Sequence, residues 1–183
     1  MDSGNITTTW DLPGQNLKGV TGAALGGWRW STIWTMQGGV PFEIKTGFNR
    51  SRQNVTSSSL GDRPNWAPGC DANSAFLGQV NAWFDVNCFV LNDVGFLGNV
   101  QARAMRGPGL FTSDWSLAKS FSFMNGRRIE VQAQAFNITN QVNFRVPAAS
   151  LWQNATTRNP NAGRITATVT PARQMQFGVK FTF

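Results

Sequence analysis

The final segment of the chain places the strongest constraint on its fold. From Arg173 to Phe183, every second residue after the first is apolar, and the residues between them are Gln, Gly, Lys or Thr. Because successive side chains of a β-strand point to opposite faces, this alternation predicts a strand with one apolar and one polar face. The predicted apolar face consists of Met175, Phe177, Val179, Phe181 and Phe183.

The same alternation recurs upstream, in residues 5–12, 28–44, 111–123 and 127–137. In 28–44 the pattern continues past a break at Gly38-Gly39-Val40-Pro41, and in 111–123 it is interrupted by Ser113 and Lys119. The chain is therefore predicted to be all-β, an antiparallel meander of about five strands. Their lengths lie near the roughly 9–11 residues of a tilted membrane strand.

The hydrophobic pattern also predicts the register of one hairpin. A two-residue loop at Asn125-Gly126 would set apolar residues opposite polar ones. A three-residue loop that also includes Met124 instead pairs Phe121 with Ile129 and keeps each face uniform. Such loops need a left-handed residue near their end, and Gly126 supplies it.

The connections between the predicted strands alternate in length. Residues 124–126 form a short turn, whereas 45–110 and 138–172 form long connections. Bacterial outer-membrane barrels have short periplasmic turns at one rim and long extracellular loops at the other. The polar faces also fit a wet lumen, since burying their charged groups in a closed core would be costly. The predicted lumen face includes Asp114, Glu130, Gln132, Gln134 and Lys180.

Five strands are too few to close a transmembrane barrel or to transport a substrate alone. The first residues also lack the basic start and apolar stretch of a secretory signal peptide. Since an exported barrel needs such a signal, residue 1 is expected to be an internal position of a longer mature protein. We therefore expect residues 1–183 to be the C-terminal segment of a transmembrane β-barrel, incomplete on its own.

Composition excludes several classes of function. The sequence has no His, which removes the commonest general base and the commonest zinc ligand. We therefore expect no enzymatic activity, no metal and no cofactor. The net charge is +7, but Lys and Arg are scattered, with Arg127-Arg128 as the only adjacent pair. Nucleic-acid binding needs clustered positive charge, so no nucleic-acid partner is expected.

The two cysteines, Cys70 and Cys88, lie in one long connection. In an oxidising extracellular compartment this predicts a disulfide between them rather than a metal site. Asp62, Asp85 and Asp93 lie in the same connection. Carboxylates of this kind bind calcium in some loops, but their spacing matches no calcium motif, and we expect solvated acids.

Several strings resemble a known family when taken in order. They are LGGWRWSTIWTMQGGVPFEI (25–44), GDRPN (61–65), WFDVNCF (83–89), RGPGLFTSDWSLAKSF (106–121), RIEVQAQAFNITNQVNF (128–144) and GRITATVTPARQMQFGVKFTF (163–183). Together they resemble the C-terminal barrel of TonB-dependent receptors of the Oar-like type. Those receptors are large outer-membrane proteins with an N-terminal carboxypeptidase-regulatory-like domain and a plug. The resemblance extends from about Trp10 to Phe183.

The resemblance implies a location in the bacterial outer membrane and a part in active uptake of a substrate. Barrels of this type have 22 strands and a plugged lumen. The plug and the TonB box lie N-terminal in the family and have no counterpart in residues 1–183. The C-terminal strand resembles the signal recognised by the barrel-assembly machinery, a role that would fall on Met175, Phe177, Val179, Phe181 and Phe183. Implied partners are outer-membrane lipid, lipopolysaccharide, the barrel-assembly machinery, and TonB through the missing N-terminal part only.

Two other functions remain compatible with the sequence. The same barrel could serve a structural or adhesive role, since the plug and TonB box that distinguish an importer lie outside these residues. A secreted, Trp-rich β-sandwich that binds carbohydrate would also show alternating strands, but it explains the two long connections less well.

Overall fold

The computed structural model describes residues 3–14, 16, 18–53, 61–123 and 126–183, which belong to two compact units. The strand unit contains Met1–Gly38, Leu110–Asn143 and Thr170–Phe183. The loop unit contains Gly39–Gly109 and Phe144–Val169. Most of the two long connections expected over 45–110 and 138–172 therefore belongs to a second compact unit.

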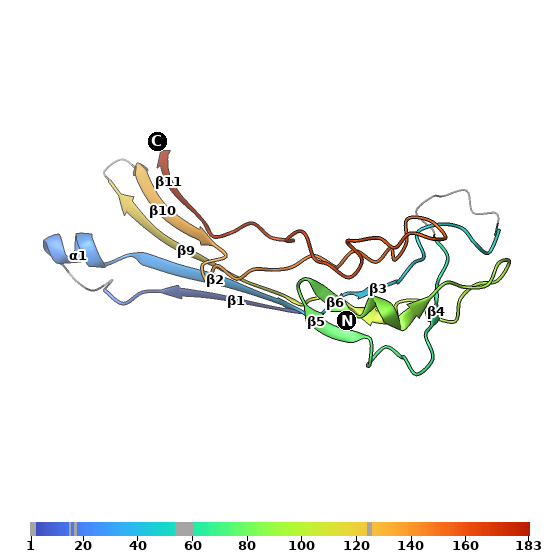
Figure 1. The fold of residues 1–183 in the computed structure, drawn as a ribbon. Coiled ribbons are helices and arrows are strands. Elements are labelled where there is room, and N and C mark those ends of the chain that lie inside the picture. The colour runs from blue at the N-terminus through green and yellow to red at the C-terminus, as the bar shows by residue number, and fades with distance from the viewer. Residues whose placement is uncertain (1–2, 15, 17, 54–60, 124–125) are drawn as a thin grey trace. The chain divides into compact units, whose positions relative to one another are not determined.

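The strand unit is an antiparallel sheet of five strands in the order β1-β2-β9-β10-β11 (Figure 1). The strands are β1 (Ser3–Asp11), β2 (Trp28–Gln37), β9 (Leu110–Ser122), β10 (Arg128–Phe136) and β11 (Gln174–Thr182). The predicted all-β antiparallel meander is confirmed. Within the residues described the sheet does not close, because β1 and β11 each pair with a neighbour on one side only.

The predicted hairpin register is also confirmed. Phe121 lies opposite Ile129, and the backbone N–H of Phe123 donates to the carbonyl oxygen of Arg127 at 2.8 Å. Gly126 has φ of 76°, the left-handed conformation that the turn requires. The other two turn residues, 124 and 125, lie outside the described residues.

The strand expected over 28–44 is shorter than the alternation indicated. It ends at Gln37, and the next strand, β3 (Pro41–Phe42), pairs with β8 (Met105–Arg106) in the loop unit. In the gap between β2 and β3 the backbone passes so close to Gly107 that a Cβ at Gly39 would overlap the Gly107 carbonyl oxygen. The sequence pattern continued past this point because Phe42 and Ile44 are apolar, but both belong to the core of the loop unit.

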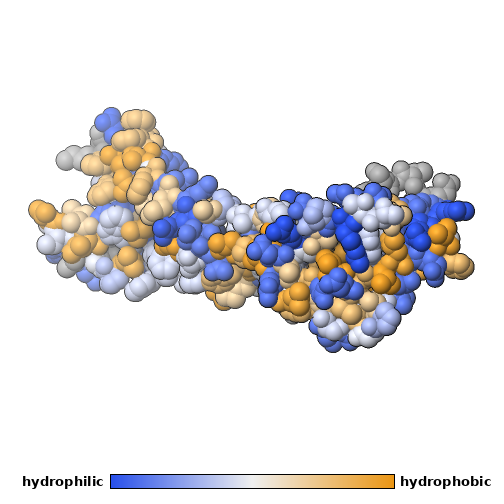
Figure 2. All heavy atoms as spheres, in the orientation of Figure 1, coloured by the Kyte–Doolittle hydropathy of each residue, from blue (hydrophilic) through white to orange (hydrophobic). Residues whose placement is uncertain are grey.

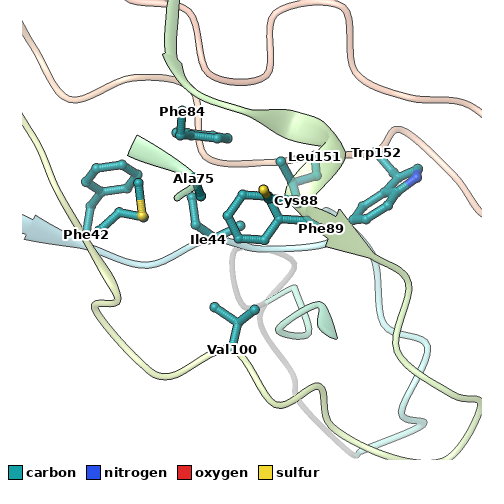
Figure 3. Packing of buried hydrophobic residues seen from close by; sticks show 10 residues of the cluster. Phe42, Ile44, Ala75, Phe84, Cys88, Phe89, Val100, Leu151 and Trp152 are labelled. Carbon is teal, nitrogen blue, oxygen red and sulfur yellow. The ribbon is translucent and has the colours of Figure 1, made fainter. Parts of the chain in front are cut away.

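The loop unit has its own hydrophobic core (Figure 3). Its remaining elements are short: β4 (Asn65–Trp66) pairs with β7 (Phe89–Val90), β5 (Phe76–Gln79) pairs with β6 (Ala82–Phe84), and a 3-10 helix η1 spans Val86–Cys88. Aromatic and aliphatic side chains fill the space between these elements. The buried core residues are Phe42, Ile44, Ala75, Phe84, Cys88, Phe89, Val100, Met105, Leu151 and Trp152.

Two distant segments of the chain are joined in the loop unit. The Lys45 N–H donates to the Ala149 carbonyl at 2.9 Å, and the Leu151 N–H donates to the Lys45 carbonyl at 2.9 Å. Arg158 stacks over the Trp152 ring at 4.0 Å, and its Nη2 donates to the Phe89 carbonyl at 2.8 Å. The insertion after β2 and the insertion after β10 therefore share one core.

A short helix, α1 (Gly19–Leu25), lies in the connection between β1 and β2. No helix among the described residues is long and apolar enough to cross a membrane.

The loop unit contains a disulfide between Cys70 and Cys88, whose sequence separation is 18. Replacing both residues with Ala is expected to destabilise this unit by about 3 kcal/mol, the chain-entropy value for a loop of this length. Amide exchange measured by mass spectrometry should accelerate in peptides from residues 65–105, while peptides from β9 and β10 should keep wild-type protection. Unchanged exchange in 65–105 would show that the core holds the unit without the disulfide.

Candidate membrane-spanning surface

The register of the strand unit assembles one continuous apolar face. Trp10 lies opposite Trp30, Trp30 opposite Leu117, and the row continues across the sheet through Ala133 to Phe177. Because side chains alternate along every strand, each such row places apolar residues on the same side. We call this side the apolar face. It comprises Ile6, Thr8, Trp10, Trp28, Trp30, Thr32, Trp34, Met36, Phe111, Ser113, Trp115, Leu117, Lys119, Phe121, Ile129, Val131, Ala133, Ala135, Met175, Phe177, Val179 and Phe181.

Much of the apolar face is uncovered. The exposed fraction is 82% for Phe177, 66% for Met175 and 61% for Val179. Figure 2 shows hydrophobic side chains gathered over the strands of this unit. Leaving apolar area in water costs about 25 cal/mol per Å². A surface of this extent is therefore expected to be covered by an apolar phase or a partner.

Aromatic pairs connect neighbouring strands on the apolar face. The rings of Trp30 and Trp115 meet edge to face with centroids 5.3 Å apart, and Trp34 and Phe111 lie 5.9 Å apart. Such cross-strand pairs stabilise a sheet and resist a shift of register.

Two of the polar residues on the apolar face, Ser113 and Lys119, are buried and form hydrogen bonds. The Ser113 Oγ accepts a hydrogen bond from Trp115 Nε1 at 2.8 Å. Lys119 Nζ donates to the carbonyl oxygens of Ala23 and Ala24 at the end of α1, the latter at 2.9 Å. It also lies 5.3 Å from the Trp28 ring centroid.

Lys119 therefore has a structural role that the alternation did not indicate. The last carbonyl groups of a helix have no partner within the helix, and a cation there is favoured by the helix dipole. Trp28 Nε1 donates to the same Ala24 carbonyl at 3.0 Å. The contacts tie α1 to the ends of β2 and β9, and they supply hydrogen-bond acceptors to an ammonium group that would otherwise be costly on an apolar surface.

The opposite side, here called the polar face, is lined by hydrogen-bonding groups. Arg29 and Asp11 form an ion pair with Nε and Oδ1 2.7 Å apart. Gln132 Nε2 lies 3.2 Å from the Ser116 Oγ, to which it donates. These groups fit a water-filled lumen, because water can hydrogen-bond the polar atoms that the side-chain pairs leave without a partner.

The residues predicted for the lumen fall on this polar face. Gln132 lies opposite Gly178, Gln134 lies opposite and hydrogen-bonds Gln176, and Glu130 lies opposite Lys180. The Asp114 carboxylate accepts from the Asn137 backbone N–H at 2.8 Å, at the end of the sheet nearest the long insertions. A hollow of about 450 Å³ between β1, β2, β9 and β10 is lined in part by Asp11, Arg29, Arg128 and Glu130.

Four of the five residues predicted for the lipid face lie on the apolar face, whereas the fifth, Phe183, lies beyond the paired part of the strand. Met175, Phe177, Val179 and Phe181 belong to β11 and to the apolar face. Phe183 follows the last paired residue and is 96% exposed, so pairing does not assign it to either face.

Asp62 is not a solvated acid, contrary to the sequence-based expectation. It is 4% exposed and accepts hydrogen bonds from the Ser51 N–H at 2.6 Å, the Ser51 Oγ at 2.7 Å and the Arg50 N–H. Burial raises the pKa of this carboxyl, but the hydrogen bonds to its charged form outweigh burial and hold the pKa below its usual value. The carboxylate thus fixes residues 50–51 to residue 62.

No group of three or more His, Cys, Asp or Glu residues is placed to hold a metal ion in the described part of the chain. Asp85 instead caps η1, where its carboxylate accepts from the Asn87 N–H at 2.9 Å.

Comparison with known proteins gives one match. The model of a family described as "Outer membrane beta barrel domain" matches residues 2–176. No curated protein and no solved structure matches the chain.

The Asp62 contacts predict a pH dependence of the loop unit. Because the folded pKa is depressed, the stabilisation is present above the unfolded value of about 3.9 and is lost as pH falls through the folded pKa. The protection factors of the amides in residues 48–53 and 61–64, which correct for the intrinsic pH dependence of exchange, should therefore fall below about pH 4. Asp62→Asn should lower these protection factors already at pH 7 and flatten their pH profile. Asp93→Asn, at an exposed position of the same unit, serves as control. A wild-type profile in Asp62→Asn would contradict this role.

Proposed function

This chain belongs to the outer membrane beta barrel domain family, and we propose that it forms part of the wall of an active importer, a TonB-dependent receptor of the Oar-like type. Its location is the bacterial outer membrane. The observation that carries the proposal is the sheet of the strand unit, in which the register keeps one face apolar and the other polar. The ordered strings that resemble Oar-like receptors supply the finer assignment.

In this proposal the apolar face contacts outer-membrane lipid and the polar face lines a lumen. A membrane interior offers no hydrogen-bond partners to strand edges, so spanning sheets must close. The free edges of β1 and β11 therefore pair with further strands of the assembled barrel. Met175, Phe177, Val179, Phe181 and Phe183 are the residues that we propose the barrel-assembly machinery recognises.

The sheet also has an orientation in this proposal. Both segments of the loop unit are inserted at the same end of the sheet. The first connects Gln37 of β2 to Leu110 of β9, and the second lies in the connection from β10 to β11. Long insertions lie outside the cell in outer-membrane barrels. The loop unit would then be extracellular, where its disulfide is stable and where a ligand arrives. The turn after β9 and helix α1 would face the periplasm.

The plug and the contact with TonB would come from parts of the receptor other than these residues. Within residues 1–183 we propose no catalytic role, no cofactor and no nucleic-acid partner. A structural or adhesive barrel is the second candidate, and the disulfide-bonded loop unit with its own core favours it as a stable surface platform.

Accessibility of single cysteines tests the membrane assignment. Each residue from 175 to 182 is replaced by Cys in the full-length protein that carries this chain, with Cys70 and Cys88 already replaced by Ala. Even positions should react with a water-soluble maleimide, subject to shielding by a plug, because they face the lumen. Odd positions should resist it and should be quenched by lipid-borne nitroxide when labelled with a fluorophore. Odd positions without lipid contact would rule out the barrel wall.

Contact with TonB separates import from adhesion. A photo-crosslinking residue is introduced in the N-terminal region of the full-length receptor, in cells that produce TonB. An importer should yield a receptor–TonB adduct that disappears in TonB-deficient cells. If the labelling of residues 175–182 alternates as expected but no adduct forms at any N-terminal position, import is wrong and the structural or adhesive role is favoured.

A further inference from the structure

A groove runs along the apolar face over strand β10. Ala133 lies between Leu117 of β9 and Phe177 of β11, and in the next row Ala135 lies between Trp115 and Met175. The small side chains of β10 thus form a floor between two rows of large ones. The groove has a volume of about 290 Å³, and the lining includes Trp30 and Ile138.

The width of the groove follows from sheet geometry. Neighbouring strands lie about 4.8 Å apart, so the rows of large side chains on β9 and β11 are separated by about 10 Å. The flanking side chains occupy part of this distance, so the gap that remains over β10 is about as wide as one hydrocarbon chain. The next row closes it, because Val131 replaces Ala and lies between Lys119 and Val179. The groove is therefore a short slot rather than a general feature of the face.

A cation lies at the open end of this slot. Arg173 precedes Met175 by two positions, and its Nη1 lies 3.5 Å from the carbonyl oxygen of Ile138, a residue of the groove lining. The Arg173 side chain is exposed and makes no ion pair with an acid of the described residues. Most of its N–H donors are therefore available, in a planar arrangement that suits a phosphate.

We propose that this slot binds one acyl chain of a phosphorylated glycolipid of the outer leaflet, with a phosphate group on Arg173. The assignment rests on the proposed orientation, which places the β10–β11 connection at the outer surface. Lipopolysaccharide combines the two features in one molecule, acyl chains and phosphate on a sugar, and it forms the outer leaflet. The exposed Asn140 side chain accepts from the backbone N–H of Arg173 at 3.0 Å and adds a polar group near this residue for the sugar.

Lipid retained by the full-length protein tests the site. The protein is purified from outer membranes in mild detergent, and bound lipopolysaccharide and phospholipid are measured by mass spectrometry. Ala133→Leu fills the slot and Arg173→Gln removes the phosphate contact. Arg173→Gln should lower retained lipopolysaccharide about tenfold, the loss expected for one charge-assisted contact, and Ala133→Leu should lower it by a similar factor because the added side chain occupies the slot. Arg173→Lys should recover part of it.

Matched variants separate the slot from nonspecific lipid contact. Ile129→Phe enlarges a side chain on the same strand and face, one row beyond the residue that closes the slot, and Arg128→Gln removes a cation at the opposite end of β10. Both should retain lipopolysaccharide as the wild type does. Three results would each overturn the site. They are equal losses in all four variants, unchanged retention in Ala133→Leu and Arg173→Gln, and retention of phospholipid in place of lipopolysaccharide.

The cysteine labelling of residues 175–182 is repeated in each variant. Intact alternation with unchanged retention overturns the site alone, whereas lost alternation in the wild type overturns the barrel proposal.

Discussion

The pairing register between neighbouring strands decides the surroundings of every side chain in the strand unit. A shift of one residue along β10 would move Ala133 and Ala135 to the polar face and bring Gln132 and Gln134 to the apolar one. The turn at Gly126 and the edge-to-face contact of Trp30 with Trp115 both oppose such a shift. The separation of apolar and polar side chains onto two faces therefore depends on backbone hydrogen bonds that themselves carry no sequence preference.

One charged residue shows how strictly this separation is kept. Lys119 occupies a position where the register demands an apolar side chain, and it is 4% exposed. Its ammonium is satisfied by carbonyl oxygens of α1 and by the rings of Trp28 and Phe121. The helix thus supplies acceptors that the sheet lacks, and in return the lysine fixes a helix that has no buried residue of its own.

The sequence predicted the sheet well because its signal is periodic and local. Each strand of the sheet is at least nine residues long, and the alternation of Met175 to Phe181 or of Ile129 to Ala135 needs no knowledge of the partner strand. The loop unit gave no such signal, since its strands have two to four residues and its core residues, such as Phe42 and Leu151, are isolated in sequence. Asp62 looked like any loop acid, because its partners Arg50 and Ser51 are recognisable only once the chain is folded. The slot over β10 could have been found from the sequence, as Ala133 and Ala135 are the two small residues on the apolar side of β10 and pair with large residues on both neighbouring strands.

The shared core of the loop unit also has a consequence for the time course of folding. The disulfide closes within the first insertion, but Leu151 and Trp152 are contributed by the second, which follows β9 and β10 in the chain. Contacts between segments so distant in sequence form slowly, because the intervening chain must first be ordered. Until then, the part of the core formed by the first insertion lacks Leu151 and Trp152. The loop unit would thus complete its core only after the β9–β10 hairpin, which separates its two segments in the chain, has been synthesised, so that a fully packed loop unit reports that this hairpin is already present.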